Sequence, residues 1–458
     1  MTKQKVQIPR LMIAGMSSGS GKTTITCGIL QALINRGMTP ASFKCGPDYI
    51  DPMFHGKVIG TKSSNLDVFF CGEKTVKGLL QQQTKGCDIA VMEGVMGYYD
   101  GTSLTGTEGS SYHVATVTDT PAVLVVNCRG MSNSIRAIVK GFLTLEEDSK
   151  IKGLIFNQIS AGVYKAIKEE IEREYEGRVR VLGGIPKLPE EVSFQSRHLG
   201  LVTAEEVPEI KQKLHKLAEY MEQHVDLDAL VELASEAAPV EEVIEDAVEA
   251  MATPIRIGVA YDKAFCFYYS ENLKLFEALG GELVYFSPMH DEKLPEGIDG
   301  LILGGGYPEL YATELMGNTS MRESIRQALE QRMPCIAECG GFMYLNKTIE
   351  GKEMVGYLDG HCENKNKLVR FGYASLEAAS DQMLVKKGET IRGHEFHYYD
   401  CTENGATMTA TKRNGTTYEA VVSNDRLYAG YAHLHFYSNK KAAKRFLEAC
   451  ADYAKEAH

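Results

Sequence analysis

The amino-acid sequence predicts an α/β protein built from two doubly wound domains. Short apolar runs alternate with helical patterns through the first half of the chain, and a second alternation of the same kind begins at Pro254. In each half, glycine-rich turns directly follow apolar runs. Because the carboxyl ends of parallel strands line the ligand crevice of such a sheet, we expect these turns to hold the functional residues.

The first half contains apolar runs with the length and composition of buried parallel strands. They are Leu11–Ala14, Thr39–Phe43, Ile89–Met92, Ala122–Val126 and Gly153–Phe156, with a further strand at Val181–Pro186. Helical patterns cover Thr24–Leu33 and Ser132–Leu145. From Ala204 to Glu249 the pattern is helical and polar, which marks the end of the first α/β unit.

The second half repeats the alternation. Its expected strands are Ile255–Ala260, Leu283–Phe286, Gly300–Leu303 and Pro334–Ala337, and Asn272–Leu279 is an expected helix. After Tyr344 the chain is richer in short alternating strands, such as Leu427–His433. The stretch Glu232–Glu249 is acidic and lacks lysine and arginine, as in a solvated linker. We therefore expect a first domain at residues 1–235, an acidic linker at 236–253 and a second domain at 254–458.

Bulk composition limits the class of protein. With 458 residues, 44% hydrophobic and 24% charged, the chain is typical of a globular protein of about two to three domains. A net charge of −12 argues against nucleic acid as a partner, and no apolar stretch is long enough to cross a membrane. The 11 scattered cysteines, without zinc-finger spacing, indicate free thiols in a reducing cytoplasm.

A phosphate-binding loop follows the first strand. The residues expected to bind ATP there are Gly15, Ser17, Gly19, Gly21, Lys22, Thr23 and Thr24. Lys22 is placed to reach the outer phosphates, and the Thr23 hydroxyl to contact Mg²⁺. Met16 stands where the common motif has its first glycine, so this loop is one residue longer. The alternative is a chance glycine-rich turn before a helix.

Acidic residues follow two other strand ends of the first half. Lys44 begins the segment KCGPDYIDP, and Glu93 begins EGVMGYYDG. We assign Thr23, Glu93 and Asp48 to Mg²⁺, because this hard cation prefers oxygen ligands. Lys44 joins the ATP-binding residues, and the carboxylates that would orient the substrate or a second ion are Asp51 and Asp100. The alternative for these last two is a role in a turn or helix cap.

A cysteine elbow is expected in the second half. Cys339 lies between a strand and the helix that Gly340 opens, where we expect an exposed thiol whose pKa the helix N-terminus lowers. The N–H groups of Gly340, Gly305 and Gly306 are candidates for an oxyanion hole. The expected base is a distant histidine, His433 or His435. The alternative is a buried structural thiol.

Two further segments need an interpretation. Arg392–His397 contains two histidines that are three residues apart, so it does not match the metalloprotease motif; we expect a strand end near a site. Ser110 is expected to cap a helix. The phosphate loop and the cysteine elbow, on one chain, indicate an ATP-dependent amidation that is supplied with nitrogen by glutamine.

These motifs occur in an order that resembles one family. The stretches KCGPDYIDP, MEGVMGYYDG, AFCFYYSENL, FSPMHDEKLP, GGGYPEL, AECGGFMYL, RGHEFHYY and YAHLHF are similar to those of the cobyrinate a,c-diamide synthase family. They lie within Gly15–Phe436, nearly the whole chain. The first half resembles the dethiobiotin-synthetase type of P-loop domain, which shares the longer loop. The second half resembles a class I glutamine amidotransferase of the cobyric acid synthase type.

The resemblance implies a carbon–nitrogen ligase of cobalamin biosynthesis in the cytoplasm. ATP with Mg²⁺ would convert the c and then the a side-chain carboxylate of cobyrinate to an acyl phosphate, which ammonia displaces. The partners would be small molecules: a tetrapyrrole polycarboxylate, ATP and L-glutamine. A membrane or nucleic-acid partner is not expected, and a homodimer is one assembly that the family allows.

The resemblance also assigns the glutaminase residues. Cys339 would attack the glutamine amide and His433 would activate it, since His433 matches the family's Tyr-x-His position. Other class I enzymes have a glutamate two residues after this histidine, where this chain has His435. A Cys–His dyad is therefore expected, with an enclosed path for ammonia from Cys339 to the phosphate loop.

Other functions stay open from the sequence. Hydrogenobyrinate or nickel-sirohydrochlorin would undergo the same reaction with the same motifs. A cobyric acid synthase and a dethiobiotin synthetase fusion fit fewer of the motifs. A different class is a partner-regulated P-loop ATPase with an inert amidotransferase-like domain. Glutaminase activity stimulated by ATP and a corrin substrate separates the ligase from that ATPase.

Overall fold

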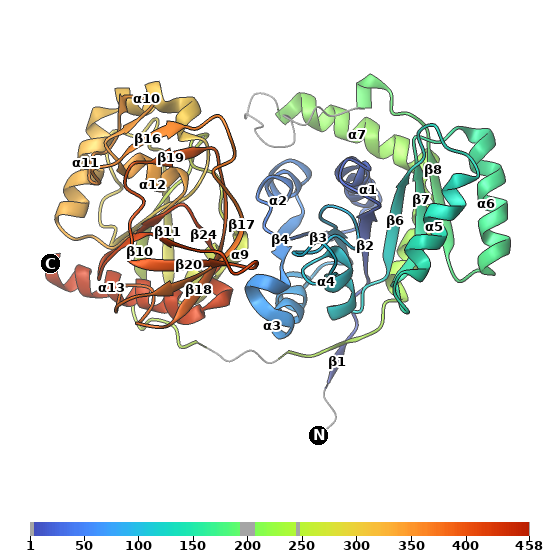
Figure 1. The fold of residues 1–458 in the computed structure, drawn as a ribbon, viewed down its shortest axis with the longest axis horizontal. Helices are drawn as coiled ribbons and strands as arrows, with labels where there is room; N and C mark the ends of the chain where they lie inside the picture. The colour runs from blue at the N-terminus through green and yellow to red at the C-terminus, as the bar shows by residue number, and fades with distance from the viewer. Residues whose placement is uncertain (1–3, 193–206, 244–247, 458) are drawn as a thin grey trace. The chain divides into compact units, whose positions relative to one another are not determined.

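A computed structural model describes residues 4–192, 207–243 and 248–457. The chain divides into two compact units, residues 1–245 and 246–458, and each is described by itself (Figure 1). No helix within the described ranges is both long and apolar enough to cross a membrane.

The first unit is built on a seven-stranded parallel sheet with the order β4-β3-β5-β2-β6-β7-β8. Its strands are β2 (Arg10–Gly15), β3 (Pro40–Cys45), β4 (Lys62–Leu66), β5 (Ile89–Glu93), β6 (Ala122–Asn127), β7 (Ile151–Asn157) and β8 (Arg180–Ile185). The central strands are buried along their length, as their apolar composition requires. The adjacent β2, β3 and β5 therefore end at one edge, with the phosphate loop, Lys44 and Glu93.

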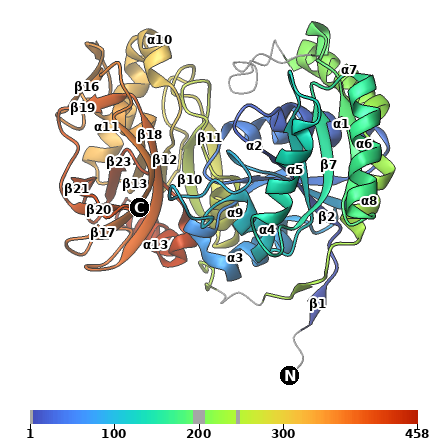
Figure 2. The ribbon, with the colours of Figure 1, turned by 45° about the vertical axis from the view of Figure 1, so that its right-hand side comes forward.

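Helices flank this sheet on both faces (Figures 1 and 2). They are α1 (Lys22–Asn35), α2 (Ile50–Phe54), α3 (Val68–Gln83), α4 (Ser111–Val117), α5 (Ser134–Thr144), α6 (Ala161–Tyr175), α7 (Val207–His224) and α8 (Leu227–Ser235). Apolar side chains of α1, α7 and α8 form one core with strand residues such as Ile13 and Val123. A π-helical turn, His55–Ile59, continues α2, and a 3₁₀ turn covers Glu190–Val192.

Two short strands close the first unit. Strand β1 (Lys5–Val6) pairs antiparallel with β9 (Val240–Glu241). Strand β9 lies within the stretch that the sequence assigns to the acidic linker. Gln81 of α3 also binds this stretch, because its side chain donates to the Glu241 carbonyl at 2.6 Å and accepts from the Val243 N–H at 3.0 Å. This part of the stretch is therefore packed against the first unit.

The second unit contains a six-stranded sheet with the order β11-β10-β12-β13-β23-β22. Its strands are β10 (Ile255–Ala260), β11 (Gly281–Phe286), β12 (Gly300–Leu303), β13 (Cys335–Glu338), β22 (Val422–Ser423) and β23 (Leu427–Gly430). All neighbours are parallel except β22 and β23. Its helices are α9 (Ser270–Ala278), α10 (Ala312–Gly317), α11 (Thr319–Glu330), α12 (Gly340–Leu345) and α13 (Lys440–Ala457), with 3₁₀ turns at Pro308–Tyr311 and Phe436–Ser438.

Two further sheets complete the second unit. A five-stranded antiparallel sheet has the order β21-β20-β17-β18-β24, and a four-stranded sheet has the order β15-β14-β16-β19. The first contains β17 (Arg370–Ala378), β18 (Thr390–His397), β20 (Met408–Lys412), β21 (Thr417–Ala420) and β24 (His433–Leu434). The second contains β14 (Thr348–Ile349), β15 (Lys352–Glu353), β16 (His361–Asn364) and β19 (Tyr399–Cys401). The pairing of β18 with β24 sets His394 opposite His433.

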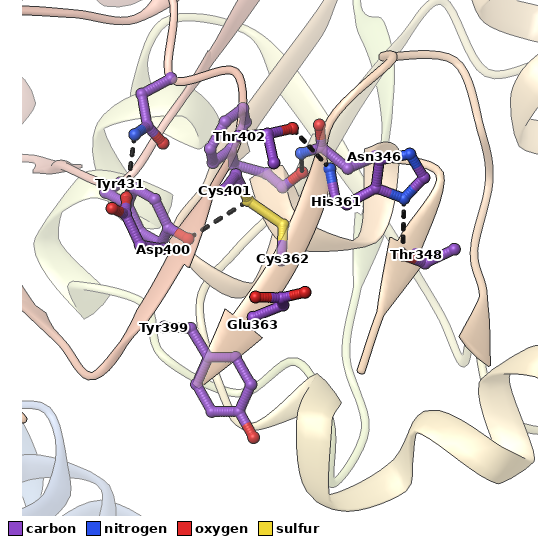
Figure 3. Close-up of a disulfide and its surroundings, with 12 residues drawn as sticks. Asn346, Thr348, His361, Cys362, Glu363, Tyr399, Asp400, Cys401, Thr402 and Tyr431 are labelled. Atoms are coloured by element: carbon purple, nitrogen blue, oxygen red, sulfur yellow. Dashed lines mark hydrogen bonds between the residues drawn. A yellow bond between two sulfur atoms is a disulfide. The ribbon is translucent and has the colours of Figure 1, made fainter. Parts of the chain in front are cut away.

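The predicted α/β class with two parallel-sheet domains is confirmed, and every strand named from the sequence overlaps an observed strand. The predicted single strand Leu427–His433 is wrong, because it covers β23 and the start of β24, which belong to different sheets. The expectation that all cysteines are free thiols is wrong. Cys362 and Cys401 form a disulfide, 39 residues apart in sequence, and they stand opposite each other on β16 and β19 (Figure 3). This register brings their Cα atoms to 4.0 Å, which no sequence spacing reveals. The other described cysteines form no disulfide.

Candidate active sites

The phosphate loop joins β2 to α1 in a conformation that depends on glycine. Gly21 caps α1 with φ at 96°, and a Cβ atom there would lie 2.4 Å from Nδ2 of Asn157. That Asn157 nitrogen donates to the Ser20 carbonyl at 2.9 Å and so fixes the loop from β7. Ser17 and Gly19 are exposed at the loop surface. The geometry is that of a loop whose helix N-terminus is open to an anion.

Lys22 lies along its own loop. Its Nζ atom donates to the carbonyls of Ser17 at 3.0 Å and Met96 at 2.6 Å. A Cβ at Gly15 would lie 2.9 Å from the Lys22 side chain, which explains the glycine at this position. Burial and the nearby Lys44 ammonium lower the pKa of Lys22. An anion placed at this loop would lie beside the Lys22 ammonium, which donates its hydrogen bonds within the described residues to backbone carbonyls.

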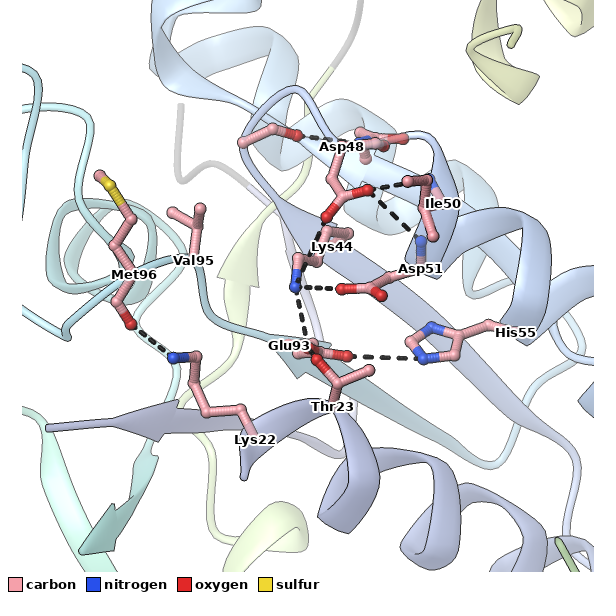
Figure 4. A network of polar contacts seen from close by, with 12 residues as sticks. Lys22, Thr23, Lys44, Asp48, Ile50, Asp51, His55, Glu93, Val95 and Met96 are labelled. Atoms are coloured by element: carbon pink, nitrogen blue, oxygen red, sulfur yellow. Dashed lines mark hydrogen bonds and ion pairs between the residues drawn. The ribbon is translucent and has the colours of Figure 1, made fainter. Parts of the chain in front are cut away.

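A buried polar cluster lies next to this loop (Figure 4). Glu93 ends β5, and its Oε1 atom accepts hydrogen bonds from the Thr23 hydroxyl at 2.5 Å and from Lys44 Nζ at 2.8 Å. Lys44 Nζ also contacts Asp51 Oδ2 at 2.5 Å, with Asp48 Oδ2 further away at 3.9 Å. The structure thus brings together Thr23, Lys44, Asp48, Asp51 and Glu93, as the strand-end argument expects.

Burial sets the protonation of this cluster. It raises the pKa of Glu93 to about 7 and that of Asp48 to about 6, with a further rise from the Asp51 charge in both cases. Burial also acts to lower the pKa of Lys44, but Glu93 and Asp51 together raise it well above its usual value. Burial acts against ionisation of Asp51 too, yet contact with Lys44 leaves its pKa below normal. Lys44 and Asp51 therefore form the charged pair of the cluster.

Asp100 supports its own turn, and its expected role toward the substrate or a second ion stays a prediction. Its Oδ2 atom accepts the N–H of Gly97 at 2.8 Å, within the turn that follows β5. A carboxylate used in this way supports the loop, as the alternative interpretation of this residue holds. It still acts on the phosphate loop through its charge, which raises the pKa of Lys22. Asp100 is thus a turn residue near the loop.

Mg²⁺ fits the chemistry of the donor set. The Thr23 hydroxyl and the Glu93 carboxylate lie in contact, and oxygen atoms are the ligands that this cation prefers. Across residues 4–192, 207–243 and 248–457, no group of three or more His, Cys, Asp or Glu side chains forms a complete cage. Mg²⁺ usually binds through one or two protein carboxylates with phosphates and water, so this partial set is sufficient.

The cysteine elbow is present at the end of β13. Cys339 has φ at 48° and ψ at −102°, a conformation that L residues rarely adopt. Its N–H donates to the Gly430 carbonyl at 2.8 Å, which anchors the turn to β23. A Cβ on Gly340 would lie 3.2 Å from the Gly306 nitrogen, so these two backbone segments meet directly beside the thiol. The oxyanion candidates Gly340 and Gly306 are therefore adjacent.

Two expectations about the Cys339 thiol are wrong. The residue is only 8% exposed, not open to solvent. Burial raises its pKa, the Glu309 charge raises it further, and only the N–H of Gly340 acts in the opposite direction. Helix α12 is six residues long, and its N-terminus does not outweigh this desolvation. The thiol is therefore protonated near neutral pH and needs a base.

His433 is the histidine that reaches the elbow region. A Cβ on Gly305 would lie 2.2 Å from His433 Cε1, which places the ring against the glycine run after β12. Burial lowers its pKa to about 3, with a smaller contribution from His394 and His397, so the ring is neutral near pH 7. A neutral imidazole can accept a thiol proton.

Glu338 approaches His433 from the residue before the nucleophile. Its Oε2 atom is 3.8 Å from His433 Nδ1, and its Oε1 atom accepts the Leu434 N–H at 3.1 Å. Burial raises the pKa of Glu338 to about 8. The carboxyl group is held between the elbow and strand β24, beside Nδ1 of the imidazole.

His435 contacts Glu271. Its Nε2 atom is 3.1 Å from Glu271 Oε1, and both side chains are fully buried. The ring also packs against Tyr269 of the preceding loop, with centroids 4.9 Å apart. His435 therefore supports the packing of α9, and the geometry favours His433 as the base.

Strand β18 lies near the cysteine site, as expected for Arg392–His397, because it pairs with β24, which carries His433. The His397 ring stacks on Tyr431 with centroids 3.8 Å apart, and the Tyr431 hydroxyl contacts Cys401 Sγ at 3.2 Å (Figure 3). In the first unit, Ser110 Oγ accepts the His113 N–H at 3.1 Å, so the expected helix cap is confirmed.

Sequence reasoning missed three side chains at these sites: His55 beside Glu93, Glu338 beside His433, and Glu271 beside His435. Glu338 carried a signal, since it directly precedes the nucleophile. His55 and Glu271 are recognisable only after folding, because their partners are 38 and more residues away in the printed sequence.

Comparisons with known proteins agree with both sites. Residues 11–202 match the family described as CobQ/CobB/MinD/ParA nucleotide binding domain, and residues 256–441 match the CobB/CobQ-like glutamine amidotransferase domain. The chain is thus an enzyme, a carbon–nitrogen ligase that combines a nucleotide-binding domain with a glutamine amidotransferase domain. It acts on small molecules and uses ATP.

Full-length relatives carry the assignment further. Three proteins named cobyrinate a,c-diamide synthase come from Caldanaerobacter subterraneus subsp. tengcongensis, Clostridium acetobutylicum and Thermoplasma volcanium. The first is 38% identical over 97% of this chain and 99% of its own length. The second is 40% identical over 94% and 97%, and the third 38% identical over 98% and 99%. The chain belongs to the cobyrinate a,c-diamide synthase family.

Proposed function

We propose that this enzyme transfers the amide nitrogen of L-glutamine to the a and c side-chain carboxylates of cobyrinate, at the expense of ATP, in cobalamin biosynthesis. The observation that carries the proposal is the presence on one chain of two built sites. One is the Thr23–Lys44–Glu93 cluster beside a phosphate loop, and the other is Cys339 on an elbow next to His433. The names of the full-length relatives support the same reaction.

The first site would activate the carboxylate. We assign the ATP phosphates to the loop residues Gly15, Ser17, Gly19, Gly21, Lys22, Thr23 and Thr24, together with Lys44. A Mg²⁺ ion bound by Thr23 and Glu93, with Asp48, would supply charge neutralisation at the transferring phosphoryl group. Asp51, ionised beside Lys44, would orient the substrate. An acyl phosphate forms and ADP leaves, which gives ammonia a good leaving group to displace.

The second site would release ammonia. His433 accepts the Cys339 thiol proton as sulfur attacks the amide carbon of glutamine, and the N–H groups of Gly340, Gly306 and Gly305 stabilise the oxyanion. His433 passes the proton to the departing nitrogen. Ammonia is released, and a glutamyl thioester remains on Cys339. Water then attacks the thioester with His433 as base, which returns the thiol and releases glutamate.

We assign Glu338 to the orientation of His433. A carboxyl group next to Nδ1 fixes the imidazole and stabilises the cation that forms when the ring takes a proton. This adds an acid to the Cys–His dyad expected from the sequence. The acid comes from the residue before the nucleophile and leaves position 435 free for its contact with Glu271.

Ammonia must reach the acyl phosphate as a neutral molecule, since the ammonium ion is not nucleophilic. We therefore propose that it travels by an enclosed path between the two sites. We also propose that the enzyme works in the cytoplasm and assembles as a homodimer, which light scattering of the purified protein tests directly.

Product mass is the decisive experiment. The protein is incubated with ATP, Mg²⁺, glutamine and cobyrinate, beside a Cys339→Ala variant. Two successive replacements of a hydroxyl by an amino group, with the variant active only on added ammonia, support the proposal. Amidation of hydrogenobyrinate or nickel-sirohydrochlorin instead would keep the mechanism and change the substrate. No change in any tetrapyrrole would overturn it and favour a partner-regulated ATPase.

A further inference from the structure

The buried side chain of His55 faces Oε2 of Glu93, whereas Thr23 and Lys44 donate to Oε1. His55 and Glu93 are both 0% exposed, and His55 Nε2 lies 3.5 Å from Glu93 Oε2 (Figure 4). Among the described residues, neither His55 ring nitrogen nor this Glu93 oxygen has a hydrogen-bond partner. Because buried polar atoms are rarely left unpaired, the position of His55 Nε2 opposite Glu93 Oε2 indicates a functional contact.

The backbone of His55 is held firmly in this place. Its carbonyl accepts the N–H groups of Gly60 at 3.0 Å and Thr61 at 3.1 Å, and the Thr61 hydroxyl at 3.1 Å. That hydroxyl also contacts Ser42 Oγ of β3 at 2.7 Å. His55 opens the π-helical turn, an uncommon element that often occurs at functional sites. The turn is thus tied to the sheet that carries Lys44.

The two oxygens of Glu93 have unequal surroundings. Oε1 receives both Thr23 and Lys44, whereas Oε2 faces the imidazole of His55. Thr23 and Lys44 are also the groups expected to turn toward a nucleotide. When Thr23 and Lys44 contact the nucleotide, His55 (Figure 4) would still contact the Glu93 carboxylate.

We propose that His55 is a positioning residue of the nucleotide site. In this role its ring presents Nε2 to Glu93 Oε2 and keeps Oε1 directed at Thr23 and Lys44. This inference rests on the proposed function, in which Thr23 and Glu93 hold Mg²⁺. Groups that orient a metal-binding side chain commonly change metal affinity tenfold or more when they are removed.

The test measures binding, not turnover. Full-length wild-type protein, His55→Leu and His55→Gln are titrated with a fluorescent ATP analogue at a series of Mg²⁺ concentrations. Glutamine retains an N–H donor near the position of Nε2, whereas leucine retains only volume. Thr26→Val is the matched control, since Thr26 on α1 is likewise fully buried with an unpaired hydroxyl. Thermal unfolding verifies that each variant is folded.

We expect His55→Leu to raise the Mg²⁺ concentration for half-maximal nucleotide binding by about tenfold. His55→Gln should stay within about threefold of wild type, and Thr26→Val should match wild type. Equal behaviour of the leucine variant and wild type would overturn the inference, as would equal loss in the leucine and glutamine variants. If His55→Leu does not fold, His55→Ala is titrated in its place, with the same increase of about tenfold expected and wild-type behaviour overturning the inference. Wild-type binding that ignores Mg²⁺ would instead refute the metal assignment of the proposed function.

Discussion

Glu338 and His433 lie on either side of the turn region that carries the nucleophile, with Oε2 of the acid 3.8 Å from Nδ1 of the imidazole. The second oxygen of Glu338 is already fixed by the Leu434 N–H at 3.1 Å. This arrangement supplies an acid for the histidine from the residue that precedes the nucleophile.

Replacement of Glu338 by glutamine tests that role. The amide keeps the shape but cannot ionise, whereas the Glu338 carboxyl, with its pKa raised to about 8, can release its proton and balance the charge when His433 becomes protonated. We expect glutamine-dependent turnover to fall by about tenfold to hundredfold, with little change in KM for glutamine and none in ammonia-dependent turnover. Glu377→Gln on the exposed side of β17 is the control. Unchanged glutaminase turnover in Glu338→Gln would refute the assignment.

The two histidines of YAHLHF should differ when each is replaced by alanine. His433→Ala is expected to lower glutaminase turnover by about hundredfold or more while ammonia still supports amidation. His435→Ala leaves Glu271 buried without its partner, so we expect a loss of about 1–3 kcal/mol in the free energy of unfolding. Urea denaturation and steady-state kinetics on the same samples measure both effects. The reverse pattern would make His435 the base.

Lys44 is expected to stabilise the first unit strongly. Lys44→Met removes the cation that neutralises Asp51 and Glu93, and both carboxyl groups are buried. We expect a loss of about 3–5 kcal/mol in the free energy of unfolding, measured by urea denaturation. The exposed Lys62→Met is the control, because its Nζ contacts only the Lys85 carbonyl at 2.7 Å in the described structure. Similar stabilities of the two variants would contradict the prediction.

Stability should decrease between about pH 4.5 and 8 in a manner that depends on Glu338. Burial raises its folded-state pKa to about 8 from an ordinary value of 4.5. The folded protein therefore holds a proton that the unfolded chain has already released, and this advantage is lost as the pH rises through 8. Glu338→Gln cannot ionise, so it should gain stability relative to wild type across this range. Parallel unfolding curves at both ends of the range would show that Glu338 is not responsible.

The sequence allows the fold and most of the first site to be predicted, because both depend on local patterns. Apolar runs identify the strands, and the strand-end rule alone brings Lys44, Asp51 and Glu93 together. The predictions that were wrong concern the Cys339 thiol and the state of the cysteines, and both properties are set by three-dimensional packing. The desolvation of Cys339 and the pairing of Cys362 with Cys401 arise from strands that are distant in sequence.

Single contacts between elements that are distant in sequence could not be predicted either. His55 reaches Glu93 through a π-helical turn, for which the residues His55–Ile59 carry no recognisable signal. Asp100 beside glycine fits a ligand or a turn equally well in the sequence, and its contact with the Gly97 N–H appears only in the folded chain.

The backbone of Cys339 has an evolutionary consequence. With φ at 48°, this position suits a residue without a side chain better than the one that catalysis requires. Cys339→Gly should therefore unfold at a higher temperature than Cys339→Ala, although neither can form a thioester. A lineage that lost its need for glutamine hydrolysis would be free to drift toward glycine here, and would gain robustness as it did so.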